Sequence, residues 1–135
     1  MKYWLVKSDP ETYSWKNLIQ DKKTDWTGVR NYQARNNLKE MNIGDLVLFY
    51  HSQEEKAIIG VAKVVKQAYQ DATTNDPHWV AVDIEPVEEF KTPVTLSQIK
   101  LNPILKNIGL IKQFRLSVMP ITKDEYEEIV KLSKI

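Results

Sequence analysis

The sequence contains no cysteine and only two histidines in 135 residues. Without cysteine, disulfide bonds and thiolate metal sites are excluded. The two histidines, His51 and His78, lack the close spacing of a paired zinc ligand, so we expect neither a metal nor another cofactor. The chain also lacks a phosphate-binding glycine loop and a dinucleotide fingerprint. No apolar run approaches the roughly 20 residues of a membrane span, and we expect a soluble, cytoplasmic protein that does not bind membranes.

A strong charge of either sign is also missing. The formal net charge is +1, with 27% charged and 42% hydrophobic residues, as in ordinary globular proteins. A protein that binds duplex nucleic acid mainly through its phosphates is usually more basic, because each neutralised phosphate needs a lysine or arginine. Any nucleic-acid binding must therefore depend on a local patch or a pocket. The length predicts a single domain over residues 1–135, and we expect a monomer.

The apolar pattern predicts an interrupted order of strands and helices. Ser14, Asn31 and Thr122 are in the right positions to cap helices, and Leu18 with Ile19 should face inward. Gly60 indicates a bulge or a close approach. The predicted strands are 2–7, 46–52 (covered on both faces), 57–69, 78–90 (half-buried) and 113–121, and the predicted helices are 12–21, 31–41 and 122–132, with short helices or turns at 93–100 and 102–107. No βαβ alternation appears, which favours an α+β domain on a compact mixed sheet or small barrel.

An aromatic and amide cluster fills the segment DWTGVRNYQARNNLKE, residues 25–40. Trp26 should lie in a loop, and Asn31, Tyr32 and Gln33 follow at the start of a helix. A planar base needs an aromatic face to stack on and amides that meet its hydrogen-bonding edge. The alternative is that Trp26 and Tyr32 anchor a loop on the core while the polar residues face water.

Three further positions could carry chemistry. The strand end VKSDPE, residues 6–11, either contacts a ligand or ends the strand with a turn. His51 and Ser52 are adjacent on a strand and should point to opposite faces, so we expect ligand contact or a structural histidine rather than a catalytic pair. Arg115 should lie in or beside the last strand, where it either pairs with a carboxylate or reaches a phosphate or ligand.

Several separated blocks together resemble the EVE domain family across essentially the whole chain. They are YWLVKSDPETYSW, WTGVRNYQARNNL, GDLVLFYHS, GVAKVV, HWVAVDI, PVTLSQIK and FRLSVMPIT, in this order. The resemblance implies an α+β fold of the PUA-like kind, a small mixed β-barrel with peripheral helices. It also implies a non-catalytic module whose partner is nucleic acid that contains a modified base. Modified cytosine in DNA is the leading candidate, flipped into an aromatic-walled pocket.

The resemblance also assigns roles to particular residues. Trp26 would be the stacking wall, and Asn31 with Ser8 would bind the edge of the base. Further wall or rim residues would be Tyr32, His51, Ser52 and Trp79, and contacts to phosphate or within the pocket would come from Lys7, Arg30, Arg35 and Arg115. Since stacking would supply much of the affinity, we expect a preference for single-stranded or destabilised sites and a shallow salt dependence.

Other functions stay open from the sequence. The bound base could belong to RNA instead of DNA. The resemblance to PUA-like domains, which include amidohydrolases, implies a second alternative: a hydrolase of modified nucleosides would use Lys7, Asp9 or His51 as acid, base or nucleophile. A protein-interaction module would instead use an exposed Trp15 or Trp79 as its anchor.

Overall fold

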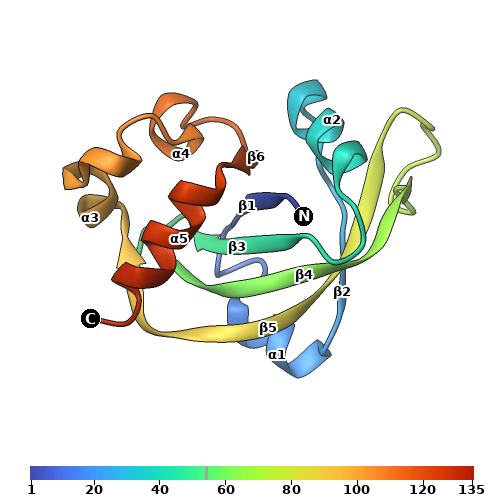
Figure 1. Cartoon of the computed structure of the whole chain (residues 1–135). Helices are drawn as coiled ribbons and strands as arrows, with labels where there is room; N and C mark the ends of the chain where they lie inside the picture. The colour runs from blue at the N-terminus through green and yellow to red at the C-terminus, as the bar shows by residue number, and fades with distance from the viewer. Residues whose placement is uncertain (54) are drawn as a thin grey trace.

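The computed structural model describes residues 1–53 and 55–135. Within these residues, helices surround one six-stranded sheet (Figure 1). The strands are β1 (Tyr3–Ser8), β2 (Thr24–Trp26), β3 (Leu46–His51), β4 (Ala57–Gln70), β5 (Val80–Thr95) and β6 (Val118–Ile121). The helices are α1 (Trp15–Asp21), α2 (Tyr32–Glu40), α3 (Leu96–Leu101), α4 (Gly109–Lys112) and α5 (Lys123–Leu132), with a 3₁₀ turn η1 (Pro103–Leu105).

The sheet is mixed and open. Its strand order is β2-β5-β4-β3-β1-β6, with β1 parallel to β3 and the other neighbours antiparallel. The predicted mixed sheet with peripheral helices is confirmed. The closed barrel is wrong for the described residues, because the edge strands β2 and β6 do not pair with each other. Both are short, at three and four residues, while the long strands β4 and β5 supply the curvature (Figure 1).

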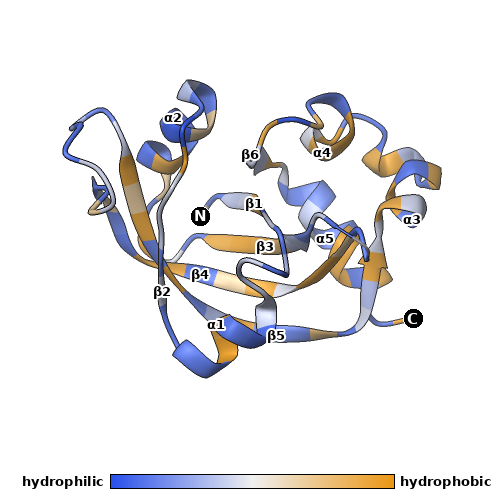
Figure 2. Ribbon diagram, turned by 180° about the vertical axis from the view of Figure 1, so that it is seen from behind, coloured by the Kyte–Doolittle hydropathy of each residue, from blue (hydrophilic) through white to orange (hydrophobic). Residues whose placement is uncertain are grey.

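The core lies on both faces of β3, as predicted, and most of β3 is coloured as hydrophobic in Figure 2. Helix α1 adds Trp15 and Leu18, which are one turn apart and both buried. The inward orientation predicted for Ile19 is wrong, since its side chain is 46% exposed. Ile19 is only one residue from Leu18 on a short helix and therefore points to a different side.

The predicted helix caps are confirmed. The side chains of Ser14, Asn31 and Thr122 accept hydrogen bonds from the backbone N–H groups of the first helical turns of α1, α2 and α5. Such caps satisfy donors that have no partner inside the helix. The cap of α2 matters most for the site, because it fixes Asn31 directly beside the segment that contains Trp26.

Gly60 shows both predicted features. The β4–β5 register shifts between Ile58 and Gly60, and a Cβ at position 60 would lie 2.7 Å from the Glu88 carbonyl oxygen and 2.7 Å from the Trp15 ring. Only glycine therefore allows α1 to press its tryptophan against the sheet at this point.

Several boundaries differ from the prediction. Strand β5 is buried on both faces from Val80 to Ile84, so the prediction of a half-buried strand is wrong for this end. The buried Asp83 carboxylate in this stretch accepts a hydrogen bond from the Tyr69 hydroxyl. The last strand begins at Val118, and residues 113–117 form a turn before it. Strand β2 and helix α4 were not predicted. No helix in the described residues is long and apolar enough to cross a membrane.

Candidate functional site

An open pocket of about 670 Å³ lies where the end of β1 faces β2. Figure 2 views this side, with β2 running beside the chain that leaves β1. The volume is in the range of small-ligand sites. Its lining comes from the end of β1, the β1–α1 connection, the end of α1, β2, the β2–α2 loop and the turn before β6: Lys7, Ser8, Asp9, Thr12, Tyr13, Asp21, Thr24, Asp25, Trp26, Thr27, Gly28, Val29, Arg30, Asn31 and Ser117. The pocket thus brings together five of the eleven predicted site residues, Lys7, Ser8, Trp26, Arg30 and Asn31.

Trp26 forms the aromatic wall of this pocket. It is the last residue of β2, where it pairs with Val82 of β5, so the loop position predicted for it is wrong. The ring is perpendicular to Phe49, at 5.6 Å between centroids, and to Tyr13, at 6.4 Å. These packed neighbours hold the half-buried indole in one orientation. Neither neighbour is stacked parallel on it.

The loop after Trp26 is held in place by Asp71, a fully buried carboxylate at the end of β4. One Asp71 oxygen accepts from the Gly28 N–H at 2.8 Å and from Arg30 at 3.0 Å, and the other accepts from the Thr73 N–H and hydroxyl. Gly28 has a φ of +81°, a conformation that favours glycine. Burial opposes the Asp71 charge, but the hydrogen bonds from Thr73, Gly28 and Arg30 outweigh burial and lower its pKa to about 2.

Asn31 and Ser8 present hydrogen-bonding atoms to the pocket. The side-chain oxygen Oδ1 of Asn31 accepts a hydrogen bond from the Ala34 N–H at 2.9 Å, which leaves the side-chain NH₂ as a donor toward the pocket. The Ser8 hydroxyl is buried and donates to the Tyr13 carbonyl, which leaves its oxygen as an acceptor. Ser52 lies next to Ser8 on the neighbouring chain segment, and its N–H donates to the Ser8 backbone carbonyl at 2.9 Å. Ser52 therefore supports Ser8 and does not line the pocket.

Lys7 ties a distant segment to the pocket rim. Its ammonium donates to the Phe114 carbonyl, and its backbone N–H donates to the Ser117 carbonyl at 2.9 Å. Burial lowers the Lys7 pKa below its ordinary value. A smaller hollow of about 290 Å³, lined in part by Phe114 and Arg115, adjoins the pocket and shares Asn31 with it.

Two predicted rim residues and one predicted phosphate contact form a separate stack beside the pocket. Tyr32 and Trp79 lie with their ring centroids 5.1 Å apart, and the Arg35 guanidinium lies 5.0 Å from the Tyr32 ring. Arg30 connects this stack to the pocket, since its guanidinium lies 5.6 Å from the Trp79 ring. Tyr32, Trp79 and Arg35 do not line the pocket itself.

His51 has a structural environment outside the pocket. Its ring is buried, Nε2 accepts from the Trp15 N–H at 3.1 Å, and Nδ1 lies 3.0 Å from a Glu55 carboxylate oxygen. Both ring nitrogens are therefore occupied in holding the start of α1. Trp15 itself is 2% exposed, so the alternative in which it is an exposed interface anchor is wrong.

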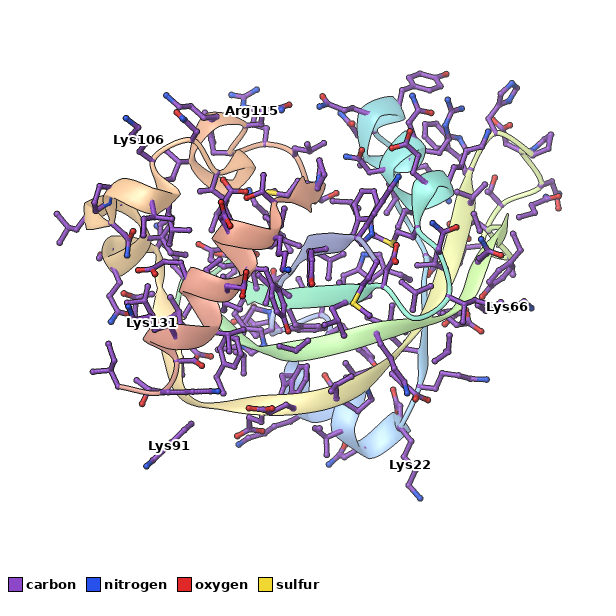
Figure 3. The ribbon with its side chains drawn as sticks, viewed as in Figure 1. Lys22, Lys66, Lys91, Lys106, Arg115 and Lys131 are labelled. Atoms are coloured by element: carbon purple, nitrogen blue, oxygen red, sulfur yellow. The ribbon has the colours of Figure 1, made fainter. Side chains whose placement is uncertain are left out.

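Arg115 is not in a strand and is exposed in the turn before β6, where Figure 3 shows it pointing away from the body. Its guanidinium lies 5.7 Å from the Phe114 ring. The predicted position of Arg115 in or beside apolar strand residues is wrong, because the strand starts three residues later, at Val118.

Several pocket residues were missed from the sequence. Tyr13 donates from its hydroxyl to Asp21 at 2.8 Å, and partial burial together with the Asp21 charge raises its pKa. Asp25 adds a third acidic group to the lining, beside Asp9 and Asp21. The turn residues at 8–13 and the cluster that begins at Asp25 were signals for two of these positions, but the pairing of β2 with β5 is not visible in the local sequence. The site therefore combines one aromatic wall, amide and hydroxyl groups, and charges of both signs.

A curved, open mixed sheet with an aromatic-walled pocket at the ends of β1 and β2 defines a class of small α+β proteins. The chain belongs to the EVE domain family, whose model matches residues 2–132. It is 37% identical to thymocyte nuclear protein 1 of Gallus gallus, over 98% of this chain and 69% of that protein.

Solved structures agree over nearly the whole length. A protein from Agrobacterium tumefaciens is 40% identical, with a TM-score of 0.96 over 100% of this chain and 94% of the other. Human THYN1, solved in complex with DNA that contains 5-methylcytosine, is 33% identical, with a TM-score of 0.92 over 100% of this chain and 99% of the other.

Proposed function

We propose that this protein is a non-catalytic reader of a modified nucleobase in nucleic acid, with modified cytosine in DNA as its leading ligand. The base is flipped into the pocket and stacks on Trp26. The observation that carries the proposal is this half-buried indole, which stands at the wall of a 670 Å³ pocket without a parallel ring stacked on it. Stacking of a base on an aromatic side chain contributes about 1–3 kcal/mol.

The neighbouring groups supply the polar half of the recognition. The Asn31 amide donates, and the Ser8 oxygen accepts, so together they match the mixed donor and acceptor edge of a cytosine. A 5-methyl group adds about one buried carbon, worth about 0.8 kcal/mol, or roughly fourfold in affinity. The complex of human THYN1 with 5-methylcytosine DNA supports this ligand class for a relative that shares the fold over its whole length.

The remaining predicted residues take supporting roles in this proposal. Arg30 is bonded to Asp71, and Lys7 to the Phe114 carbonyl, so both hold the pocket walls. Arg35 lies on Tyr32. With these cations engaged inside the protein, few phosphate contacts remain at the pocket, which favours a shallow salt dependence.

Fluorescence anisotropy with labelled single-stranded oligonucleotides tests the proposal. Matched DNA and RNA strands would carry cytosine, 5-methylcytosine, 5-hydroxymethylcytosine, adenine or N6-methyladenine at one position. We expect saturable binding that favours one modified base. Trp26→Ala should weaken it roughly 5- to 150-fold, as expected for a lost base stack.

Two variants make the result specific. Trp26→Phe keeps an aromatic wall and should retain most of the affinity, while Trp79→Ala removes a tryptophan outside the pocket and should change it little. Equal binding of all bases, or full affinity in a folded Trp26→Ala variant, contradicts the proposal. Turnover of a modified nucleoside by the unaltered protein would favour the hydrolase alternative instead.

A further inference from the structure

The turn between α4 and β6 places an exposed aromatic ring beside the pocket. Phe114 is 70% exposed, although an aromatic side chain of this size is usually buried. It lines the smaller hollow that shares Asn31 with the pocket. Phe114 was not among the residues predicted from the sequence, because the segment 113–121 was predicted to be a strand.

Phe114 is held at the pocket rim by contacts to its backbone. Its carbonyl accepts the Lys7 ammonium, and Lys7 itself lines the pocket. One residue earlier, the Gln113 side-chain oxygen accepts from the Gln33 amide of α2 at 2.8 Å. Helix α2 and strand β1 therefore fix this turn from two sides, while the ring remains in solvent. The position of the ring is set without burying it.

The surroundings of Phe114 suit a polyanion. From Leu96 to Pro120 the chain contains four basic residues, Lys100, Lys106, Lys112 and Arg115, and no acidic residue. Arg115 lies over the Phe114 ring at 5.7 Å, and Lys112 lines the same hollow. Figure 3 shows Lys106 and Arg115 on the same outer side of the molecule. A phosphate backbone that passes this side would meet cations next to an apolar ring.

We propose that Phe114 inserts into the base stack of a duplex and fills the space left by the base that enters the Trp26 pocket. Apolar side chains, including phenylalanine, are used as wedges between base steps, and extrusion of a base from a duplex costs a few kcal/mol that such a contact offsets. This inference rests on the proposed function. It adds that duplex DNA is a substrate of the site, and that the ring, with Arg115 and Lys112 beside it, is the element that makes duplex binding possible.

The experiment compares one sequence in two forms, a 12-base-pair duplex with a single central 5-methylcytosine and the same modified strand alone. Phe114→Ala should weaken duplex binding roughly 5- to 150-fold, the range for loss of one aromatic stack, and change single-strand binding less than about twofold. Phe114→Leu keeps an apolar wedge and should retain part of the duplex affinity. Leu101→Ala removes another exposed apolar side chain, 86% exposed and outside both hollows, and should change neither affinity.

The outcomes separate this inference from the proposed function. The role of Phe114 as a wedge is contradicted if Phe114→Ala loses affinity equally for both forms or loses none for either. It is also contradicted if the unaltered protein binds the single strand and not the duplex. None of these results contradicts the proposed recognition of a modified base. Trp26→Ala should weaken binding to both the duplex and the single strand, because it removes the aromatic wall that the base itself contacts. If the unaltered protein binds neither form of any modified strand, the proposed function fails and the wedge fails with it. Because Phe114 is exposed, circular dichroism should show an unchanged fold in both of its variants.

Discussion

Replacing Asp71 by asparagine should both destabilise the protein and remove part of its acid sensitivity. The fully buried carboxylate receives hydrogen bonds from Gly28, Arg30 and Thr73. Asparagine keeps one acceptor oxygen for Thr73 but turns an NH₂ toward the Gly28 N–H and the Arg30 guanidinium. The charge-assisted hydrogen bonds from Gly28 and Arg30 are both lost. Because the Arg30 side chain is 40% exposed, water partly replaces the bond that Arg30 loses. We expect a loss of about 2–3 kcal/mol in the free energy of unfolding.

The pH dependence gives an independent value for the same interaction. The Asp71 pKa is about 2 in the folded protein against an ordinary 3.8. A lowered pKa stabilises the fold above pH 4, and this contribution is lost as the pH falls toward 2. The difference corresponds to roughly 2 kcal/mol at neutral pH. About 1 kcal/mol of it should be gone at pH 3.

Urea unfolding at pH 7 and at pH 3, followed by circular dichroism, measures both effects. The gap in unfolding free energy between the unaltered protein and Asp71→Asn should narrow by about 1 kcal/mol on going to pH 3, since asparagine does not titrate. A gap that stays constant, or one that is below about 1 kcal/mol at pH 7, would refute the role assigned to this carboxylate.

Four other outcomes follow from the same contacts. Gly60→Ala should cost about 3 kcal/mol or more in urea unfolding, because the new Cβ would lie 2.7 Å from the Trp15 ring and from the Glu88 carbonyl; a loss below 1 kcal/mol would contradict that close approach. Gly28→Ala should lower stability by about 1–2 kcal/mol through its φ of +81° alone, as no atom lies within 4 Å of the added Cβ; a neutral effect would contradict the backbone argument. His51→Ala should destabilise by about 1–3 kcal/mol, because it leaves the buried Trp15 N–H without an acceptor, yet leave oligonucleotide affinity unchanged; a selective loss of affinity would return His51 to the ligand site. The slope of log K against log salt for a single strand should be about −1.4, for two phosphate contacts, and a slope beyond about −4 would show a phosphate-dominated interface.

Local signals in the sequence predicted local structure well. The caps at Ser14, Asn31 and Thr122 are confirmed, since a side chain that bonds its own helix start acts over only three residues. The close approach at Gly60 is likewise confirmed, because glycine inside a strand pattern has few other uses. The apolar run of β3 correctly predicted a strand buried on both faces.

Long-range pairing accounts for what the sequence did not reveal. Strand β2 has only three residues, and it exists because β5 pairs with it across more than 50 residues of chain. A separation of 43 and 41 residues likewise hides the hydrogen bonds of Asp71 to Gly28 and Arg30. The open sheet also depends on how its two edges end, which no local pattern specifies. Five pocket residues were predicted as site residues, Lys7, Ser8, Trp26, Arg30 and Asn31. The side chains that hold them in place, such as Asp71, were not predicted.

The most direct test of the central claim is a thermodynamic cycle on the pocket wall. Dissociation constants would be measured for the unaltered protein and for Trp26→Ala, each with matched single strands that contain either 5-methylcytosine or cytosine. We expect a preference of about fourfold for the methylated strand in the unaltered protein and the loss of this preference in Trp26→Ala. A preference that survives in Trp26→Ala would place base recognition outside this pocket and contradict the account.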